Sequence, residues 1–266
     1  MGNNVCMSFA DAGKGFPVLL GHSYLFDNTM WAPQSDELSV NYRVIAPDLW
    51  GHGASPALPA GVRTTADLAV DHLNLMDRLG INEFAVVGLS VGGMWAAELA
   101  ALAPGRVKAL MLFDTFLGNE TVEAQEKYFS MLNAVASAGA ITSPLLDYIV
   151  SQFYSASAPD EDVAALKLHL MSLTAQNLRE SIVPVGKMIF GRANRMDILD
   201  KITCPAHVAT GEFDLPRPPA EGQAMAERLA CDFTMIPQAG HISNREKPEQ
   251  VTRLIMDFLA NTLHSE

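Results

Sequence analysis

One serine lies between two glycines where an apolar run stops and a helix-forming run begins, within residues 86–100. Ser90 has Gly88 two positions before it and Gly92 two positions after it. A serine hydroxyl is a poor nucleophile unless a base lies beside it and the backbone holds it exposed. A strand that turns tightly into a helix provides that position, and the helix N–H groups stabilise developing negative charge. The pattern predicts nucleophilic catalysis at Ser90.

The spacing Gly-x-Ser-x-Gly between an expected strand and an expected helix resembles the nucleophile elbow of the α/β-hydrolase family. That family carries its catalytic groups in the order serine, acid, histidine. His241 lies in a loop after the last expected strand and is followed by Glu246-x-Pro248 and a closing helix. This is where the family carries its general base, so the resemblance implies that His241 activates Ser90.

The acid of the family's triad holds the imidazole in the correct tautomer and stabilises the imidazolium. Asp214 follows the expected strand at residues 207–210 and is our prediction for this role. Asp114, directly after the expected strand at residues 107–113, is the alternative. The alternative stays open because some members of the family take their acid from that strand.

The family's oxyanion hole needs two backbone N–H donors, one after the nucleophile and one after an earlier strand. Val91 is the first donor by position. For the second, alignment on the apolar residues 18–20 gives Ser23, with Tyr24 as the next choice. This loop departs from the usual His-Gly pattern. Together with the Met-Trp-x-Pro-Gln of residues 30–34, it resembles the enol-lactonase-like branch of the family.

A sheet must position these groups, and the chain has the apolar runs to build one. Runs without polar alternation indicate central strands that are covered on both faces. They lie at residues 18–20, 43–49, 84–90, 107–115, 207–214 and 233–240. Helical patterns alternate with them, which predicts an α/β protein with a mostly parallel sheet flanked by helices. The resemblance implies an α/β-hydrolase fold with seven or eight strands.

Residues 116–200 break this alternation because they contain helical patterns and no convincing strand. We interpret them as a helical cap inserted into a core formed by residues 1–115 and 201–266. A cap over the carboxyl edge of the sheet would help to line the substrate pocket. Candidate pocket residues are Met131, Leu132, Met171, Met188 and Phe190 in the cap and His22 and Tyr24 in the core, although His22 is equally open to a structural hydrogen bond.

The charge of the substrate is left open by the cap. Its Met, Leu, Phe and Ala content favours a neutral ester or lactone, since ligand pockets are mostly apolar. The resemblance to enol-lactonases favours an anionic substrate, which needs a cation. Six cap residues could supply one: Lys127, Lys167, Arg179, Lys187, Arg192 and Arg195.

Composition narrows the classes of partner. The chain has 18 Lys and Arg against 30 Asp and Glu, a formal charge of -12, which disfavours nucleic acid and anionic membranes. Neither metal-ligand spacing nor a dinucleotide or phosphate fingerprint is present, so we expect no metal and no cofactor. The three cysteines lack a C-x-x-C spacing and favour reduced thiols in the cytoplasm. We expect a small-molecule substrate and leave a homodimer open.

The reaction implied by the resemblance is hydrolysis of carboxylic esters or lactones through an acyl-enzyme at Ser90. Epoxide hydrolases and haloalkane dehalogenases of this fold have aspartate at the elbow, so Ser90 disfavours both. C–C bond hydrolysis and cofactor-free perhydrolysis use the same triad and stay open. An alternative of another class is a ligand receptor on a hydrolase scaffold, with slow turnover and a stable protein partner.

Overall fold

The computed structural model describes residues 6–263, in which seven strands form one sheet. The strand order is β1-β3-β2-β4-β5-β6-β7; β1 is antiparallel to β3 and the other neighbours are parallel. This confirms the predicted fold class. The strands are β1 (Phe9–Gly13), β2 (Phe16–Gly21), β3 (Tyr42–Pro47), β4 (Phe84–Leu89), β5 (Val107–Phe113), β6 (Ala206–Gly211) and β7 (Asp232–Ile236).

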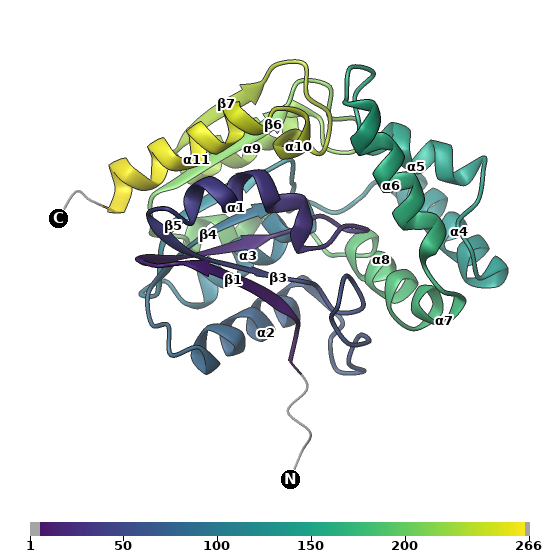
Figure 1. Cartoon of the computed structure of the whole chain (residues 1–266), viewed down its shortest axis with the longest axis horizontal. Helices are drawn as coiled ribbons and strands as arrows, with labels where there is room; N and C mark the ends of the chain where they lie inside the picture. The colour runs from purple at the N-terminus through teal and green to yellow at the C-terminus, as the bar shows by residue number, and fades with distance from the viewer. Residues whose placement is uncertain (1–5, 264–266) are drawn as a thin grey trace, which may run out of the picture.

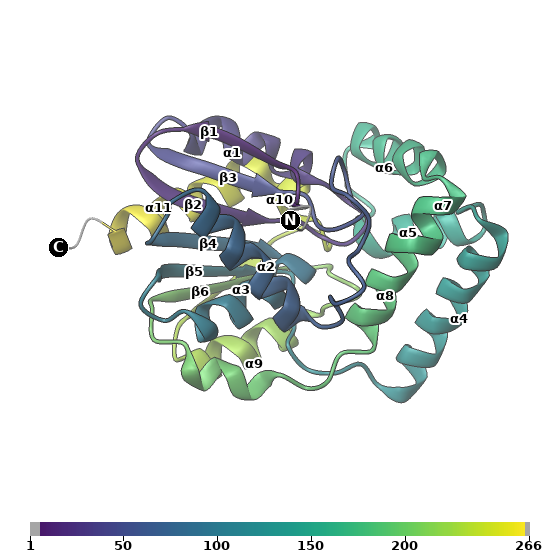
Figure 2. The ribbon, with the colours of Figure 1, turned by 90° about the horizontal axis from the view of Figure 1, so that it is seen from below.

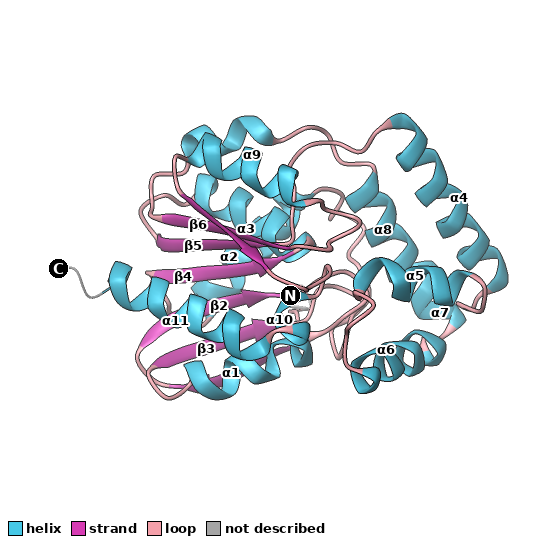
Figure 3. Ribbon diagram, turned by 90° about the horizontal axis from the view of Figure 1, so that it is seen from above, coloured by secondary structure: helices cyan, strands magenta, loops and turns pink. Residues whose placement is uncertain are grey.

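Helices cover both faces of the sheet, which explains why the central strands read as unbroken apolar runs. Every residue of β4 is buried. Helices α1 (Ala32–Leu38) and α11 (Pro248–Leu263) lie on one face, and α2 (Thr65–Arg78), α3 (Val91–Leu102) and α9 (Pro219–Leu229) lie on the other (Figure 2 and Figure 3). The short helix α10 (Ser243–Glu246) precedes α11.

Local sequence signals set the ends of these helices. Thr64 caps α2: its hydroxyl accepts from the Asp67 amide, and the Asp67 carboxylate accepts from the Thr64 amide in return. After α2 the backbone reverses at Gly80, whose φ of 68° lies in the left-handed region that favours glycine. These two signals account for the bounds of α2 at Thr65 and Arg78.

Residues 116–200 contain helices and, within the described chain, no strand. The helices are α4 (Val122–Ala138), α5 (Leu145–Phe153), α6 (Asp160–Ser172), α7 (Ala175–Asn177) and α8 (Val183–Phe190), with a π-helical turn at Leu178–Ile182 and a 3₁₀ turn at Met196–Lys201. Figure 1 shows α4 to α8 gathered on one side of the molecule, beyond the carboxyl ends of the parallel strands. We propose that this segment acts as a cap on a core formed by the rest of the chain.

Polar contacts hold the cap helices against the core. The Tyr24 hydroxyl donates to the Ile182 carbonyl at 2.7 Å, and the Arg195 guanidinium donates to both carboxylate oxygens of Glu98 at 2.7 and 2.9 Å. Arg245 of α10 forms an ion pair with Asp162 of α6. These contacts fix α6, the π-helical turn and the segment after α8 relative to the core.

Two histidines are buried inside the core in their neutral form. His72 stacks on Trp95 with ring centroids 3.6 Å apart, and its Nδ1–H donates to the Leu68 carbonyl at 2.6 Å. His52 lies in the loop after β3, where its Nδ1–H donates to the Trp50 carbonyl at 3.0 Å. Burial is the main cause that lowers the pKa of both imidazoles to about 3, from an ordinary value of 6.5.

Acid should therefore destabilise the fold before most carboxylates titrate. The unfolded chain binds protons at these histidines below about pH 6.5 and the folded chain does not, so their stabilisation is complete above pH 6.5 and is lost as the pH falls toward 3. Each histidine should cost about 2 kcal/mol at pH 5. The difference between the free energies of unfolding in urea at pH 7.5 and at pH 5 measures the summed contribution of all histidines whose pKa is lowered on folding. His72→Phe, which keeps the stacking, should reduce the difference by about 2 kcal/mol; an unchanged difference would contradict the assignment.

Candidate active site

Ser90 occupies the sharp turn between β4 and α3. Its backbone has φ 58° and ψ −121°, a strained conformation that helix and strand hold in place from either side. The two flanking positions have no space for a side chain, and this is why both are glycine. A Cβ on Gly88 would lie 2.3 Å from the Gly92 carbonyl oxygen, and a Cβ on Gly92 would lie 2.2 Å from the Gly21 carbonyl oxygen. The elbow predicted from the sequence has its physical cause in this close approach of three backbone segments.

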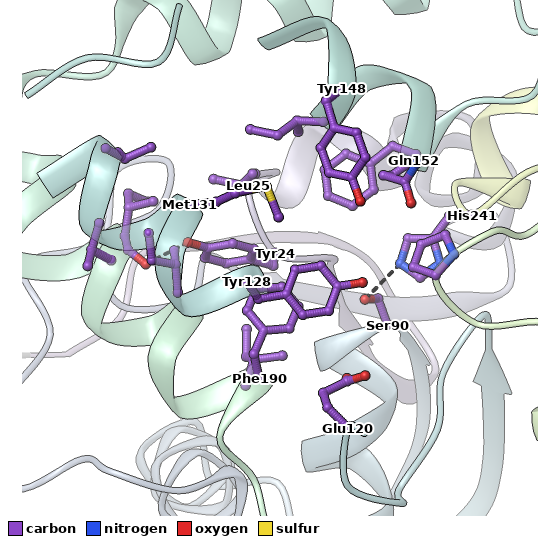
Figure 4. A pocket seen from close by; sticks show the side chains of 18 of the residues that line it. Tyr24, Leu25, Ser90, Glu120, Tyr128, Met131, Tyr148, Gln152, Phe190 and His241 are labelled. Atoms are coloured by element: carbon purple, nitrogen blue, oxygen red, sulfur yellow. Dashed lines mark hydrogen bonds between the residues drawn. The ribbon is translucent and has the colours of Figure 1, made fainter. Parts of the chain in front are cut away.

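His241 and Asp214 lie behind the serine in a continuous hydrogen-bonded line. The Ser90 hydroxyl is 2.9 Å from His241 Nε2 (Figure 4). His241 Nδ1 lies 3.0 and 2.9 Å from the two carboxylate oxygens of Asp214. His241 comes from the loop between β7 and α10, and Asp214 from the loop after β6. The side chains of His241 and Asp214 are 3% and 0% exposed. The three residues predicted for catalysis therefore meet at the carboxyl edge of the sheet.

Neighbouring groups hold the acid and the imidazole in place. The Arg217 amide donates to Asp214 Oδ1 at 2.8 Å, which leaves the carboxylate facing the imidazole. Phe153 of α5 stacks against the His241 ring, with centroids 5.6 Å apart and planes 15° from parallel. A cap helix thus completes the surroundings of the general base, and water is excluded from one face of the imidazole.

Asp114, the alternative acid, makes no contact with His241. Its Oδ1 accepts from the Gly211 amide at 2.7 Å, and its Oδ2 lies 2.5 Å from the Ser243 hydroxyl. Burial, and then the negative charge of Asp214, raise the pKa of this carboxyl well above its ordinary value. Asp114 therefore ties the end of β6 to the loop that carries His241, and Asp214 is the carboxylate that faces the imidazole.

Known proteins share the fold of this chain. A model described as alpha/beta hydrolase fold matches residues 16–248. The chain belongs to the α/β-hydrolase family. It is 29% identical over 255 residues to a pimeloyl-[acyl-carrier protein] methyl ester esterase from Chromobacterium violaceum, covering 93% of this chain and 95% of that protein.

Two solved α/β-hydrolase structures are also similar. A thermophilic esterase from Thermogutta terrifontis, solved with malate bound, is 31% identical with a TM-score of 0.86 and covers 96% of this chain and 93% of its own. An enol-lactonase from Burkholderia xenovorans LB400 is 27% identical with a TM-score of 0.84 and covers 96% of both chains. The resemblance inferred from the sequence is confirmed, and the chain has the fold of a hydrolase with esterase and enol-lactonase relatives.

The structure changes one of the two amides that the sequence analysis expected as oxyanion donors. Val91 begins α3 directly after the nucleophile, as expected. Ser23 is unsuitable, because its amide donates to Met30 Sδ at 3.3 Å and its side chain is fully buried. Tyr24 lines the cavity at Ser90, and its amide has no partner among the described residues. We propose the amides of Tyr24 and Val91 as the two donors.

The reason for the shift is the length of β2. The strand continues to Gly21, which pairs with Gly88 of β4, whereas the sequence alignment ended it at Leu20. The loop therefore begins one residue later, and the proposed second donor moves one position along the chain, from Ser23 to Tyr24. His22 is also corrected: it is fully buried, its Nδ1–H donates to the Ser23 carbonyl at 2.7 Å, and its Nε2 accepts from the Leu49 amide at 2.8 Å. It supports the loop and does not line the cavity.

A cavity of about 110 Å³, measured as the space open to the centre of a water-sized sphere, lies between Ser90 and the helices of residues 116–200. Ser90 and His241 line it on the core side, and most of the remaining wall is apolar (Figure 4). Of the residues predicted from the cap, Met131, Leu132 and Phe190 line it as expected. Met188 is buried away from it and Met171 is 63% exposed, because each points to a different side of its helix.

The sequence analysis missed most of the polar lining: Glu120, Tyr128, Tyr148, Gln152 and Arg217. A signal for two of them exists. Glu120 and Arg217 follow β5 and β6 within a few residues, and ligands in open α/β sheets bind outside the carboxyl ends of the strands. Within residues 6–263, no group of three His, Cys, Asp or Glu could hold a metal ion, and no helix is long and apolar enough to cross a membrane.

Proposed function

We propose that the protein is a serine hydrolase that cleaves carboxylic esters or lactones through an acyl-enzyme intermediate. The observation that carries this proposal is the 2.9 Å contact between Ser90 Oγ and His241 Nε2, backed by Asp214 and open to an apolar cavity. The esterase and enol-lactonase relatives support the same class of substrate. The site has the three parts that acyl transfer needs: a nucleophile with its base, an acid behind the base, and N–H donors for the oxyanion.

Acylation begins when Ser90 Oγ attacks the ester carbonyl carbon and His241 Nε2 takes the hydroxyl proton. The carbonyl oxygen becomes an oxyanion, which accepts hydrogen bonds from the Tyr24 and Val91 amides. When the tetrahedral intermediate collapses, the bond to the alkoxy group breaks and His241 returns the proton to the leaving alcohol. The Asp214 carboxylate holds Nδ1–H throughout and stabilises the imidazolium.

Deacylation repeats these steps with water. His241 takes a proton from a water molecule, the resulting hydroxide attacks the acyl carbon, and the same two amides hold the oxyanion. Collapse releases the carboxylic acid and returns the proton to Ser90. In a lactone the leaving alcohol stays attached to the acyl group, so the product is a single hydroxy acid.

Covalent labelling combined with turnover tests this function. A fluorophosphonate should add one phosphonyl group, mapped to Ser90 by peptide mass spectrometry, because only this hydroxyl has a base beside it in the cavity. The same protein should hydrolyse p-nitrophenyl butyrate or an uncharged lactone over many turnovers. Labelling without turnover would favour a receptor, and labelling elsewhere would refute Ser90 as the nucleophile.

A further inference from the structure

One side of the cavity wall contains a buried carboxylate held by two guanidinium groups. Glu120 Oε1 accepts from Arg192 Nη1 and from Arg217 Nη2, both at 2.8 Å, and Glu120 Oε2 accepts from Arg217 Nη2 at 2.7 Å. The three residues are 8%, 8% and 6% exposed, and all three line the cavity. They come from the loop after β5, the end of the cap and the loop after β6, so the cluster joins cap and core.

Two acids face the two guanidinium groups of the cluster, and they do so unequally. Glu120 is buried and contacts both guanidinium groups. Glu221 is the other nearby acid: its Oε2 lies 3.5 Å from Arg217 Nη1, and its side chain is 30% exposed. Among the described residues, Arg192 therefore shares its carboxylate partner with Arg217, which has a second acid beside it. Buried charges are normally paired, so Arg192 is the less balanced of the two cations.

Arg192 also has hydrogen-bond donors without acceptors. Its Nη1 donates to Glu120 and to the Ile189 carbonyl at 2.9 Å, but its Nε and Nη2 are buried and have no partner among the described residues. Burial, and then the positive charge of Arg217, lower the pKa of this guanidinium. An unpaired N–H of a buried cation is costly, and a ligand that accepts from it recovers that cost.

The other cap cations do not have this arrangement. Lys167 pairs with Asp147 and Arg195 with Glu98, and both cations have side chains close to 40% exposed. Lys127 donates to the Tyr148 hydroxyl at an exposed position, and Arg179 and Lys187 are exposed as well. Of the six cations that the sequence offered, Arg192 alone is buried and lines the cavity. Its partner Arg217 comes from the core.

The cluster lies close to the reacting groups. The Arg217 amide donates to Asp214 Oδ1 at 2.8 Å, so the same residue supports the catalytic acid through its backbone and reaches Glu120 with its side chain. Figure 4 shows the Glu120 carboxylate directed toward Ser90 and Tyr128, with Met131 on a different side of the cavity. An ester held at Ser90 therefore has an apolar wall in one direction and the charged cluster in another.

We propose that Arg192 and Arg217 form a carboxylate-binding subsite, so that the preferred ester or lactone carries one carboxylate besides the bond that is cleaved. This inference rests on the function proposed above. A carboxylate matches the planar donors of a guanidinium, and its negative charge would balance Arg192, which shares Glu120 with Arg217. The apolar part of the wall then holds the uncharged portion of the substrate. The apolar composition of the cap favoured a neutral substrate, but the two arginines in the cavity wall lead us to expect a charged one.

Matched ester pairs test the subsite. The monomethyl esters of succinic, glutaric and adipic acid, and acetate esters of ω-hydroxy acids, place a carboxylate at graded distances on the acyl or the alcohol side. Each is compared with the isostere in which an isopropyl group replaces the carboxylate, for example methyl 5-methylhexanoate for monomethyl glutarate. The ratio of kcat/KM within the best pair should favour the carboxylate by about 10- to 100-fold, the range for charged hydrogen bonds.

Variants in the cluster distinguish a loss of carboxylate recognition from a general loss of activity, because they should change the kcat/KM ratio of each ester pair in opposite directions. Arg192→Gln and Arg217→Gln should each lower the ratio by about tenfold or more, since one charged donor set is lost. Glu120→Gln removes the internal competitor for the guanidinium groups and should raise it. Arg195→Gln, an exposed control in the cap, should leave it within about twofold. The proposal is overturned if the wild type prefers the isopropyl esters throughout, or if both arginine variants keep the wild-type ratio.

A binding measurement keeps this test independent of turnover. Glutarate should raise the Tm of the Ser90→Ala protein, glutaramide should not, and Arg217→Gln in the same background should abolish the shift. If no ester is hydrolysed but glutarate binds in this way, the subsite stands and the hydrolase proposal fails. If neutral esters are hydrolysed and glutarate does not change the Tm, the hydrolase proposal stands and the subsite proposal fails.

Discussion

Replacing Ser90 with alanine should lower kcat/KM for p-nitrophenyl butyrate by about 10⁴-fold or more, by analogy with deletions of catalytic triad residues in other hydrolases. The hydroxyl oxygen forms the bond to the acyl carbon, so without it neither an acyl-enzyme nor its hydrolysis can follow. His241 and the two amides would remain and could only assist direct attack by water. The residual rate measures that assistance.

The Ser90→Ala protein should stay folded. The strain at φ 58° belongs to the backbone, and alanine has the same Cβ as serine, so the free energy of unfolding should change by less than about 1 kcal/mol. Ser243→Ala is a matched control because Ser243 lies two residues from His241 and contacts Asp114, away from the nucleophile. Its loss of rate should stay below about tenfold, the worth of one neutral hydrogen bond. Activity of Ser90→Ala within tenfold of wild type would reject Ser90.

Asp214→Asn should lower kcat by about 10⁴-fold, as an amide in the orienting position does in a related triad. An asparagine at 214 can present its NH₂ group to Nδ1, which favours the imidazole tautomer with the proton on Nε2. That nitrogen then faces Ser90 as a donor and cannot accept its proton. The 2.9 and 3.0 Å contacts of Asp214 with Nδ1 make this the residue that sets the tautomer.

Asp114→Asn provides the comparison. Burial raises the pKa of Asp114, and an amide has nearly the same shape as a carboxyl group, so the amide oxygen can still accept from the Gly211 amide. The Ser243 hydroxyl, which donates to Asp114 Oδ2, can rotate to accept from the NH₂ group instead. Its kcat should fall by less than about tenfold, because hydrogen bonds of this kind are worth about 1 kcal/mol each. Steady-state kinetics of the two variants under identical conditions decide the assignment. A larger loss for Asp114→Asn would move the acid to the end of β5.

Features that depend on neighbouring residues were readable from the sequence. The turn at Ser90 needs small residues at fixed offsets, because the backbones of Gly88, Gly92 and Gly21 approach too closely for a Cβ. The buried strands appear as apolar runs because helices cover both faces of the sheet. The strand Phe9–Gly13 differs from the buried ones: it lies at the sheet edge and is largely exposed, so it has no apolar signal.

Features that depend on where distant segments meet were decided only by the tertiary structure. Asp114 and Asp214 both follow strands, and only the path of the loop after β6 shows which one faces His241. β2 runs to Gly21 and the Ser23 amide is occupied by Met30, which is why we propose Tyr24 rather than Ser23 as the second oxyanion donor.

The cluster at the cavity wall is the clearest case. Glu120 is 72 residues from Arg192 and 97 from Arg217, and nothing in the spacing of these residues predicts their contact. Short-range steric and hydrophobic patterns in the sequence determined the elbow and the layers around it, and the resemblance to the family implied the order serine, acid, histidine. The choice of acid, the oxyanion donor and the charge of the cavity wall depend on side chains that meet through space, and folding alone brings those together.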